Sequence, residues 1–389
     1  MSEELSRQLH TWQQRLLVLG IVLLVAAIVD GFLHPDQFFR SYLLGFMFWF
    51  GLSLGCTAFL LLNHLTGGKW GIPVRRPLEA GVRTFPLMAL FLVPLLFGMH
   101  HLFLWTHKEV VAADPVLRLK SIYLNVPFFL GREVIYFAFW FWITQRLTRW
   151  SSELDRTGDI SFKRRLERIG GWGLVAYGLT VTFFSIDWVM SLEAYWFSTI
   201  FGLIFIVIQV QAAIAFAALV ARILGDFEPV GKMITPARFN DLGNLLLTFV
   251  MLWAYLAFSQ FLIIWTGDLL DEIPWYVSRA GPGWAVLAVV LIVFYFAVPF
   301  FLLLMRDIKR RSQTLARLCV VLLILNFADL FWMIVPSFHP NGPRFYLLDL
   351  LLPVGMGGIW LAFYLWKLKS YPFLPEHDPD FSGALEYGD

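Results

Sequence analysis

The stretch TFFSIDWVMSLEAYWF, residues 182–197, ends a long apolar run, yet it carries Asp187 in its middle and Glu193 near its close. Ionisable groups inside hydrophobic segments are costly, and they commonly mark functional sites. We expect Asp187 to lie near the outer end of a membrane-spanning helix. Glu193 is expected to reach water in the tight turn that follows. The composition of the whole chain shows whether this segment is expected to cross a membrane.

The composition is that of a protein that crosses a membrane several times. Of the 389 residues, 59% are hydrophobic and only 15% are charged, and the mean hydropathy is +0.69. Soluble domains carry about 25% charged residues. The net charge of +2 gives no indication of nucleic-acid binding.

The cysteine and histidine content excludes several cofactors from this chain. Cys56 and Cys319 are the only cysteines, so the sequence has no CxxC or CxxCH motif for zinc, an iron–sulfur cluster or covalent haem. A b-type haem needs two histidines that face each other. Only His100 and His101 fall deep in a predicted span, and both are in the same one, so no metal site is expected.

Apolar runs of about 20 residues predict ten transmembrane helices, because backbone polar groups in lipid must be satisfied within the segment. The predicted fold class is therefore an all-α polytopic membrane protein. The predicted spans are 15–33, 42–63, 85–106, 124–146, 171–190, 196–222, 242–265, 283–305, 314–335 and 346–367.

The distribution of Lys and Arg predicts the orientation. With ten spans, 23 of the 30 basic residues fall on the side that holds both termini. Basic loops stay in the cytoplasm, so both termini are predicted to be cytoplasmic. The longest cytoplasmic loop is expected near 147–170.

Features that recur in the same order indicate an internal repeat, with spacings of 160 residues for the Trp-Thr pair and 142 for the aspartates. Trp105-Thr106 recurs as Trp265-Thr266, and the Asp187 region resembles that around Asp329. Spans two to five then correspond to spans six to nine, as two parallel four-helix bundles. The predicted units are 1–41 (an N-terminal segment and flanking span), 42–195 (the first bundle), 196–340 (the second bundle) and 341–389 (a flanking span and an acidic cytoplasmic tail).

Five ionisable residues are expected at one depth, in the outer half of the first bundle. They are candidates for a proton-transfer or quinone site: His100, His101, Arg132, Glu133 and Asp187. Arg132 and Glu133 are adjacent, so each needs a partner on another helix. A structural ion pair between Arg132 and Asp187 is the alternative to a proton-handling role.

Four polar residues elsewhere are secondary candidates for a proton path: Gln209, Asp241, Asn326 and Asp329. Polar groups at this depth also stabilise contacts between helices. Both interpretations stay open at this stage.

Two long motifs resemble a known family. SIDWVMSLEAYWFSTIFG (185–202) and DLGNLLLTFVMLWAYLAFSQFLIIWTGDLLDEIPWY (241–276), with the ten-span layout, resemble the shorter NrfD-like integral membrane subunits (the ActF family) of bacterial alternative complex III. The resemblance covers nearly the whole chain. That complex is a quinol:electron-acceptor oxidoreductase of the bacterial inner (cytoplasmic) membrane.

The resemblance implies a set of partners and cofactors. The partners would be a related NrfD-like subunit (ActC), an iron–sulfur subunit, c-type cytochrome subunits and small membrane anchors. Haem and iron–sulfur clusters would belong to those partners, whereas this chain would bind no covalent cofactor. Quinone or menaquinone is the ligand that it would contact.

Three functions therefore remain. The first is a respiratory or photosynthetic oxidoreductase subunit, with a quinone-binding or proton-translocating role at the outer half of the first bundle. The second is a secondary transporter built from parallel repeats. The third is a structural scaffold.

Overall fold

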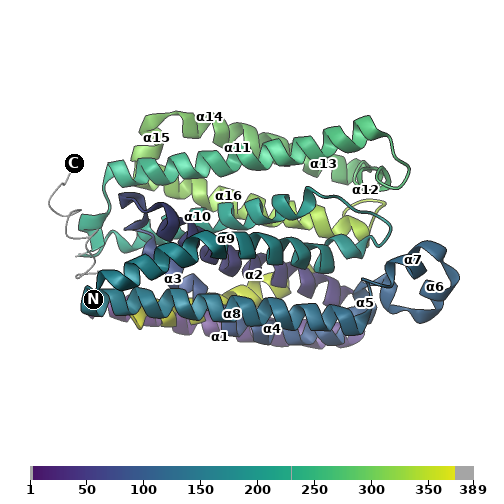
Figure 1. Ribbon diagram of the computed structural model, residues 1–389, viewed down its shortest axis with the longest axis horizontal. Coiled ribbons are helices and arrows are strands. Elements are labelled where there is room, and N and C mark those ends of the chain that lie inside the picture. Colours follow the sequence, from purple (N-terminus) through teal and green to yellow (C-terminus); the bar gives the residue numbers. More distant parts are fainter. Residues whose placement is uncertain (1–2, 229, 373–389) are drawn as a thin grey trace.

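The computed structural model describes residues 3–228 and 230–372. It confirms an all-α protein with ten helices that are long and apolar enough to cross a membrane. Figure 1 shows these helices running side by side along the longest axis, with the short helices α6 and α7 projecting at one end. The acidic tail predicted after the last span lies beyond the described residues.

The helices that form the spans are α1 (Glu3–Leu33), α2 (Pro35–Thr66), α3 (Arg75–Val82), α4 (Phe85–Phe97), α8 (Val126–Thr157), α9 (Ile160–Trp188), α10 (Phe201–Leu224), α11 (Pro236–Gly267), α13 (Pro282–Val290), the π-helix η5 (Leu291–Ala297), α14 (Val298–Leu304), α16 (Ser312–Ile334) and α17 (Leu348–Lys369).

The shorter helices are η1 (Lys69–Gly71), α5 (Met99–Leu102), η2 (Leu104–Thr106), α6 (Lys108–Ala113), α7 (Pro115–Lys120), η3 (Met190–Leu192), η4 (Val230–Met233), α12 (Pro274–Val277), α15 (Arg306–Arg310) and η6 (Val335–Ser337).

The start of α1 and the end of α17 lie at the same end of the molecule, where Lys369 donates a hydrogen bond to Gln13 (2.6 Å). We call this the basic end, because Arg75 and Lys163 also lie there. An even number of spans gives this arrangement.

The third span differs from its predicted limits of 85–106. It begins at Arg75 and ends at Phe97, so His100 and His101 lie beyond it, in the short helix α5. The prediction that the two histidines lie deep in this span is therefore wrong. The sequence suggested a later start because three arginines precede residue 85, but inside the protein these arginines pair with buried acids.

The predicted loop at 147–170 is also wrong. Helix α8 continues to Thr157 and α9 begins at Ile160, so only a two-residue turn separates them. Gly158 ends α8 in the left-handed region (φ 67°), and the Asp159 carboxylate caps α9 by accepting a hydrogen bond from the Ser161 amide. Gly at a helix end and Asp at the next start are the expected capping residues.

Two helices form the centre of the structure. Helix α2 packs against α3, α4 and α9, and α10 packs against α11 and α16; α2 and α10 also pack against each other. Helix α17 covers α2, and α1 covers α17. Lipid-facing helices gain little from hydrophobic burial, so small residues that permit close approach decide such contacts.

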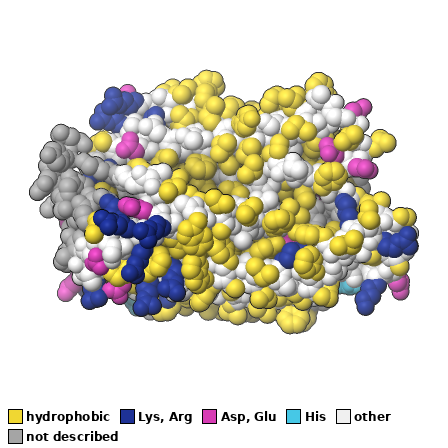
Figure 2. Space-filling model, in the orientation of Figure 1, with side chains coloured by type: hydrophobic (Ala, Val, Ile, Leu, Met, Phe, Trp, Pro, Cys, Tyr) yellow, Lys and Arg dark blue, Asp and Glu magenta, His cyan; other side chains and the backbone are white. Residues whose placement is uncertain are grey.

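The surface distribution of side chains agrees with a membrane location. Figure 2 shows hydrophobic side chains over the middle of the visible face, with charged side chains gathered toward the two ends. Large apolar residues such as Phe97, Leu90 and Phe258 are exposed. In water this surface would be unstable, whereas in lipid it needs no cover.

Gly55 of α2 tests the close contact between the two central helices. A Cβ atom there would lie 2.0 Å from the Gln209 carbonyl oxygen of α10. We expect Gly55→Ala to force the helices apart and to destabilise the fold by about 1–3 kcal/mol. Gly178→Ala is the control, because a Cβ at Gly178 of α9 meets nothing within 4 Å. Equal unfolding temperatures of the two variants in detergent would contradict this packing.

Candidate functional site

Arg132 of α8 and Asp187 of α9 form a buried ion pair. The Arg132 Nε and Nη2 atoms donate to the two carboxylate oxygens of Asp187 at 3.0 and 2.7 Å, and the Tyr136 hydroxyl donates to the same carboxylate at 3.3 Å. Asp187 has no exposed surface. Two parallel bonds between a guanidinium and a carboxylate are strong and directional. Asp187 therefore neutralises Arg132 and joins two helices of the first bundle.

The remaining face of the Arg132 guanidinium is covered by aromatic rings and backbone. Its carbon lies 3.8 Å from the centre of the Tyr123 ring and 4.5 Å from that of Phe128. Its Nη1 atom donates to the Tyr123 carbonyl (3.0 Å). Cations are stabilised over aromatic faces, so Arg132 is held on every side.

Outside the span, hydrogen bonds join the segment before α8 to the turn that follows Asp187. The Lys120 amine donates to the carbonyls of Ala194 and Tyr195 at 2.8 and 2.9 Å. The Tyr195 hydroxyl donates to Asp114 (2.7 Å), and this hydrogen bond lowers the pKa of the exposed Asp114 carboxyl. The segment before α8 is thereby fixed over the ion pair.

Glu133, adjacent to Arg132, has a different environment. Its side chain is 3% exposed, and neither carboxylate oxygen has a hydrogen-bond partner among the described residues. The Trp188 indole is the donor that lies close to this carboxylate, and its Nε1 atom has no other partner within that part of the chain. A buried polar group without a hydrogen bond is costly and requires an explanation. Of the candidates, Glu133 is thus the one whose burial is not explained by a structural role.

His100 and His101 do not join this site. His100 is exposed, and its ring lies 3.8 Å from that of His107. The His101 Nδ1 atom contacts the Asp36 carboxylate at 2.6 Å, and its ring stacks on Phe39. Of the five primary candidates, the structure brings together Arg132, Glu133 and Asp187.

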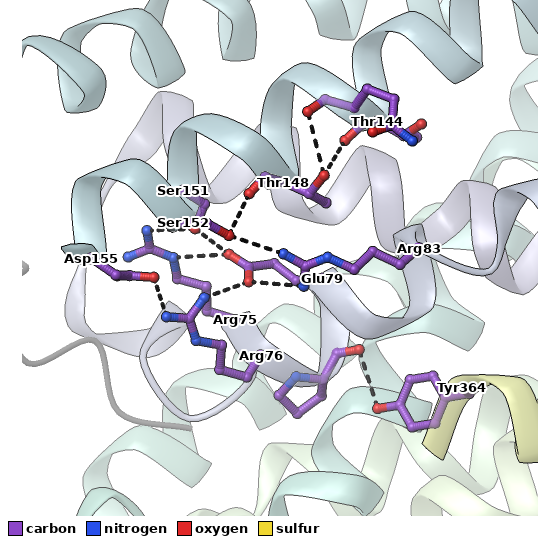
Figure 3. Close-up of polar contacts among 12 residues, drawn as sticks. Arg75, Arg76, Glu79, Arg83, Thr144, Thr148, Ser151, Ser152, Asp155 and Tyr364 are labelled. Atoms are coloured by element: carbon purple, nitrogen blue, oxygen red, sulfur yellow. Dashed lines mark hydrogen bonds and ion pairs between the residues drawn. The ribbon is translucent and has the colours of Figure 1, made fainter. Parts of the chain in front are cut away.

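A second buried charge cluster lies in the same bundle at the basic end, and the sequence interpretation missed it. Figure 3 shows Arg75, Arg76 and Arg83 converging on Glu79. The distances from Glu79 oxygens to these arginines are 3.4, 2.6 and 3.6 Å, and Glu79 has no exposed surface. We call these four residues with Asp155 the Glu79 cluster.

Helix α8 provides the other wall of the Glu79 cluster. Ser151 donates to Glu79, and Asp155 pairs with Arg76. Arg75 in turn donates to the Ser151 hydroxyl at 3.0 Å. Three guanidinium groups thus face two carboxylates, so the cluster carries one excess positive charge.

One face of α8 connects the two charged clusters. Polar side chains recur on it every three or four residues, which places them on one side of a helix. This polar stripe consists of Arg132, Tyr136, Trp140, Thr144, Thr148, Ser151 and Asp155, and all but the last are buried. It extends over about 35 Å at 1.5 Å per residue, which is close to the thickness of a bilayer core, about 30 Å. The regular spacing could have been found in the sequence.

The second bundle holds a smaller polar set. Trp253 donates to Asp329 (2.9 Å), and the Asn326 amide donates to the Tyr295 hydroxyl and the Ile208 carbonyl, both at 2.9 Å. Tyr295 lies in the π-helix η5, a feature that often occurs at functional positions. Asp329 has a neutral donor where Asp187 has an arginine.

Gln209 and Asp241 are the remaining secondary candidates. The Tyr177 hydroxyl donates to Gln209 at 2.8 Å. Gln209 and Asn326 both line a cavity of about 10 Å³ between α2, α10 and α16, whereas Asp241 is exposed near the start of α11. The structure therefore places Gln209 close to Asn326 and leaves Asp241 apart.

Glu193 is only partly exposed, with 21% of its side chain accessible, and it is ion-paired rather than free in water as the opening stretch suggested. The Arg279 Nη1 atom and the Ser337 hydroxyl donate to its carboxylate at 2.8 and 2.9 Å. Arg279 is 2% exposed and lies 3.8 Å from the Trp275 ring. Glu193 therefore joins the turn after α9 to Arg279, which follows α12, and to Ser337 of η6.

Comparison with known protein families and with characterised proteins finds no match for this chain. Within residues 3–228 and 230–372, no group of three or more His, Cys, Asp or Glu side chains is arranged to hold a metal ion. The fold and the buried clusters thus define the class, a polytopic helical membrane protein with ionisable groups in its interior.

The Arg132–Asp187 pair is expected to stabilise the fold. Asp187→Asn leaves the buried guanidinium uncompensated, and loss of one partner of a buried pair costs about 3–5 kcal/mol. The unfolding temperature in detergent should fall clearly. Replacing both residues by apolar ones should restore part of the loss.

The control is an exposed ion pair on the same helix. Arg156 and Glu153 are 2.8 Å apart, and the arginine side chain is 72% exposed. We expect Glu153→Gln to cost less than about 1 kcal/mol. An equally small effect of Asp187→Asn would show that Arg132 has other sufficient partners.

Proposed function

We propose that this chain is the NrfD-like integral subunit of a bacterial alternative complex III and that its first bundle transfers protons during quinol oxidation. The resemblance in residues 185–202 and 241–276 motivates the complex, its partner subunits and the bacterial inner membrane. Electrons would pass through haem and iron–sulfur clusters of the partners. The termini would be cytoplasmic, because the basic end contains most arginines and lysines.

The observation that carries the proton-transfer role is the buried Glu133, which is adjacent in sequence to Arg132 at one end of the polar stripe. A buried carboxyl without a charge partner costs less free energy when it carries a proton. Near it, Asp187 is neutralised by Arg132, so Glu133 is the acid in this region that can change its protonation at least cost. Hydroxyl groups along the stripe can both donate and accept.

The Glu79 cluster would form the opposite terminus of this path. Ser151 is hydrogen-bonded to Glu79, and Thr148 lies one turn from Ser151 on α8. Thr144 continues the row, with the Thr148 hydroxyl donating to its carbonyl at 2.9 Å. A path of this kind requires a protonatable group at both ends, which Glu133 and Asp155 provide.

Quinone binding at the outer half of the first bundle is the second candidate for the same complex. The aromatic rings around Glu133 favour it: Trp188 packs against Phe129, Phe103 and Phe46. In that case Glu133 would accept a proton from the quinol hydroxyl as a general base.

A secondary transporter would need a polar site near the midplane. The strongest charge clusters of the first bundle instead lie toward the two ends of α8. A scaffold would account for the ion pairs but not for Glu133, because an apolar residue would stabilise that position better.

Glu133→Gln in the assembled complex tests the proposal. Glutamine keeps the size of the side chain but cannot gain or lose a proton in this pH range, so it removes the ionisable carboxyl. We expect the complex to assemble, and quinol oxidation coupled to proton release to fall by about 10²-fold or more. Turnover is measured with a soluble quinol, and proton release with a pH indicator.

Glu153→Gln is the matched control, since Glu153 is on the same helix and outside the buried stripe. Normal turnover and proton release in Glu133→Gln, with intact assembly, would disprove both the proton-transfer and quinone roles. Normal quinol oxidation with reduced proton translocation would favour the proton path over the quinone site.

A further inference from the structure

A cavity lies at the basic end, away from Glu133. It has a volume of about 240 Å³ and lies where the end of α2, the turn that follows it, the start of α3, the end of α8 and the start of α9 meet. A single water needs only about 10–15 Å³ of such space. The cavity is therefore large enough for a small charged group.

Three basic side chains from three helices line this cavity. Arg75 comes from the first residue of α3, Lys163 from the first turn of α9, and His64 from the last turn of α2. Glu167 of α9 is the acidic residue in the lining. The balance of charge in the lining is positive before the histidine is counted.

The Glu79 cluster adds to this positive potential and fixes Arg75. Arg75 donates to Ser151 at 3.0 Å, and its Nε atom lies 3.4 Å from Glu79. The cluster carries one excess positive charge, and Arg75 is the member that also lines the cavity. A guanidinium oriented in this way by other residues loses little freedom when it binds an anion.

The turn between α2 and α3 gives backbone rather than side chains to the cavity wall. Gly67 and Gly68 have positive φ angles of 64° and 104°, which other residues rarely adopt, and both line the cavity with Gly71. A Cβ atom at Gly71 would lie 1.9 Å from the Asn63 side-chain nitrogen. Glycine at these positions thus keeps the cavity open.

The position of the cavity selects the ligand. It lies at the end of four membrane-spanning helices, at the level where lipid headgroups meet the protein. Its wall also includes the apolar side chains Leu154, Leu166 and Ile72. Basic pockets between helices on this side of a membrane are suited to phosphate-bearing headgroups, and arginine matches phosphate geometry well.

We infer that this cavity, which we call the basic-end pocket, binds a phosphate group through Arg75 and Lys163. The group is either the phosphodiester of an anionic lipid or a soluble phosphate. This site is independent of Glu133 and of the electron-transfer assignment, since it depends only on the basic-end pocket.

The test compares Lys163→Glu with Arg164→Glu in the full-length protein. The two residues are adjacent on α9 and the substitutions change the charge equally, but Arg164 is exposed and does not line the pocket. The general attraction to an anionic membrane therefore falls equally in both variants. Only Lys163→Glu removes a pocket ligand.

Bound lipid is measured by native mass spectrometry, and stability by thermal unfolding in nanodiscs of phosphatidylcholine with or without phosphatidylglycerol. We expect phosphatidylglycerol to bind and stabilise the wild type and Arg164→Glu. Its affinity for Lys163→Glu should be lower by about tenfold or by a larger factor. Lys163→Gln, with a smaller loss, provides the same comparison if the charge reversal prevents folding.

A parallel titration with inorganic phosphate in phosphatidylcholine nanodiscs identifies the source. Stabilisation by inorganic phosphate that is lost in Lys163→Glu would assign a soluble phosphate to the pocket. Equal responses of Lys163→Glu and Arg164→Glu to both anions, or no response of the wild type to either, would overturn the inference.

Discussion

The structure depends on the requirement that charges inside a membrane protein be paired across helices. Neighbours on one helix cannot face each other, so Arg132 pairs with Asp187 on the next helix rather than with Glu133. In the Glu79 cluster, Arg76 of α3 pairs with Asp155 of α8, and Ser151 of α8 donates to Glu79. Each pair fixes the relative position of two helices in a medium where hydrophobic burial between them contributes little.

The same requirement is met differently at the two aspartates that the predicted repeat matches. Asp187 of α9 has a charged partner, whereas Asp329 of α16 has the neutral indole of Trp253. Arg279, which precedes α13, pairs with Glu193 from the connection between α9 and α10. The opening stretch therefore supplies two paired carboxylates, Asp187 to Arg132 and Glu193 to Arg279.

Ten spans and the helical class could be predicted from the sequence, because hydropathy directly reflects the cost of exposing backbone to lipid. The pairing of Arg132 with Asp187 was also anticipated as an alternative. The Glu79 cluster was not, since the positive-inside rule assigns arginines before a span to a loop. Arg76 is buried because it pairs with Glu79 and with Asp155, and Asp155 is too distant in the sequence for this pairing to be predicted. The depth of His100 was wrong for the same reason.

Glu133 differs from the other buried charges because the charged groups next to it, Arg132 and Asp187, are already paired with each other. Arg132 is occupied by two bonds to Asp187, a carbonyl and two aromatic rings, so it has little capacity left for a second carboxylate. Placing a glutamate beside this closed pair therefore creates a buried acid whose charge is not compensated locally. A sequence selected for stability alone would place an apolar residue there. The cost of retaining Glu133 is the physical reason to assign it to proton transfer, while Asp187 holds the helices.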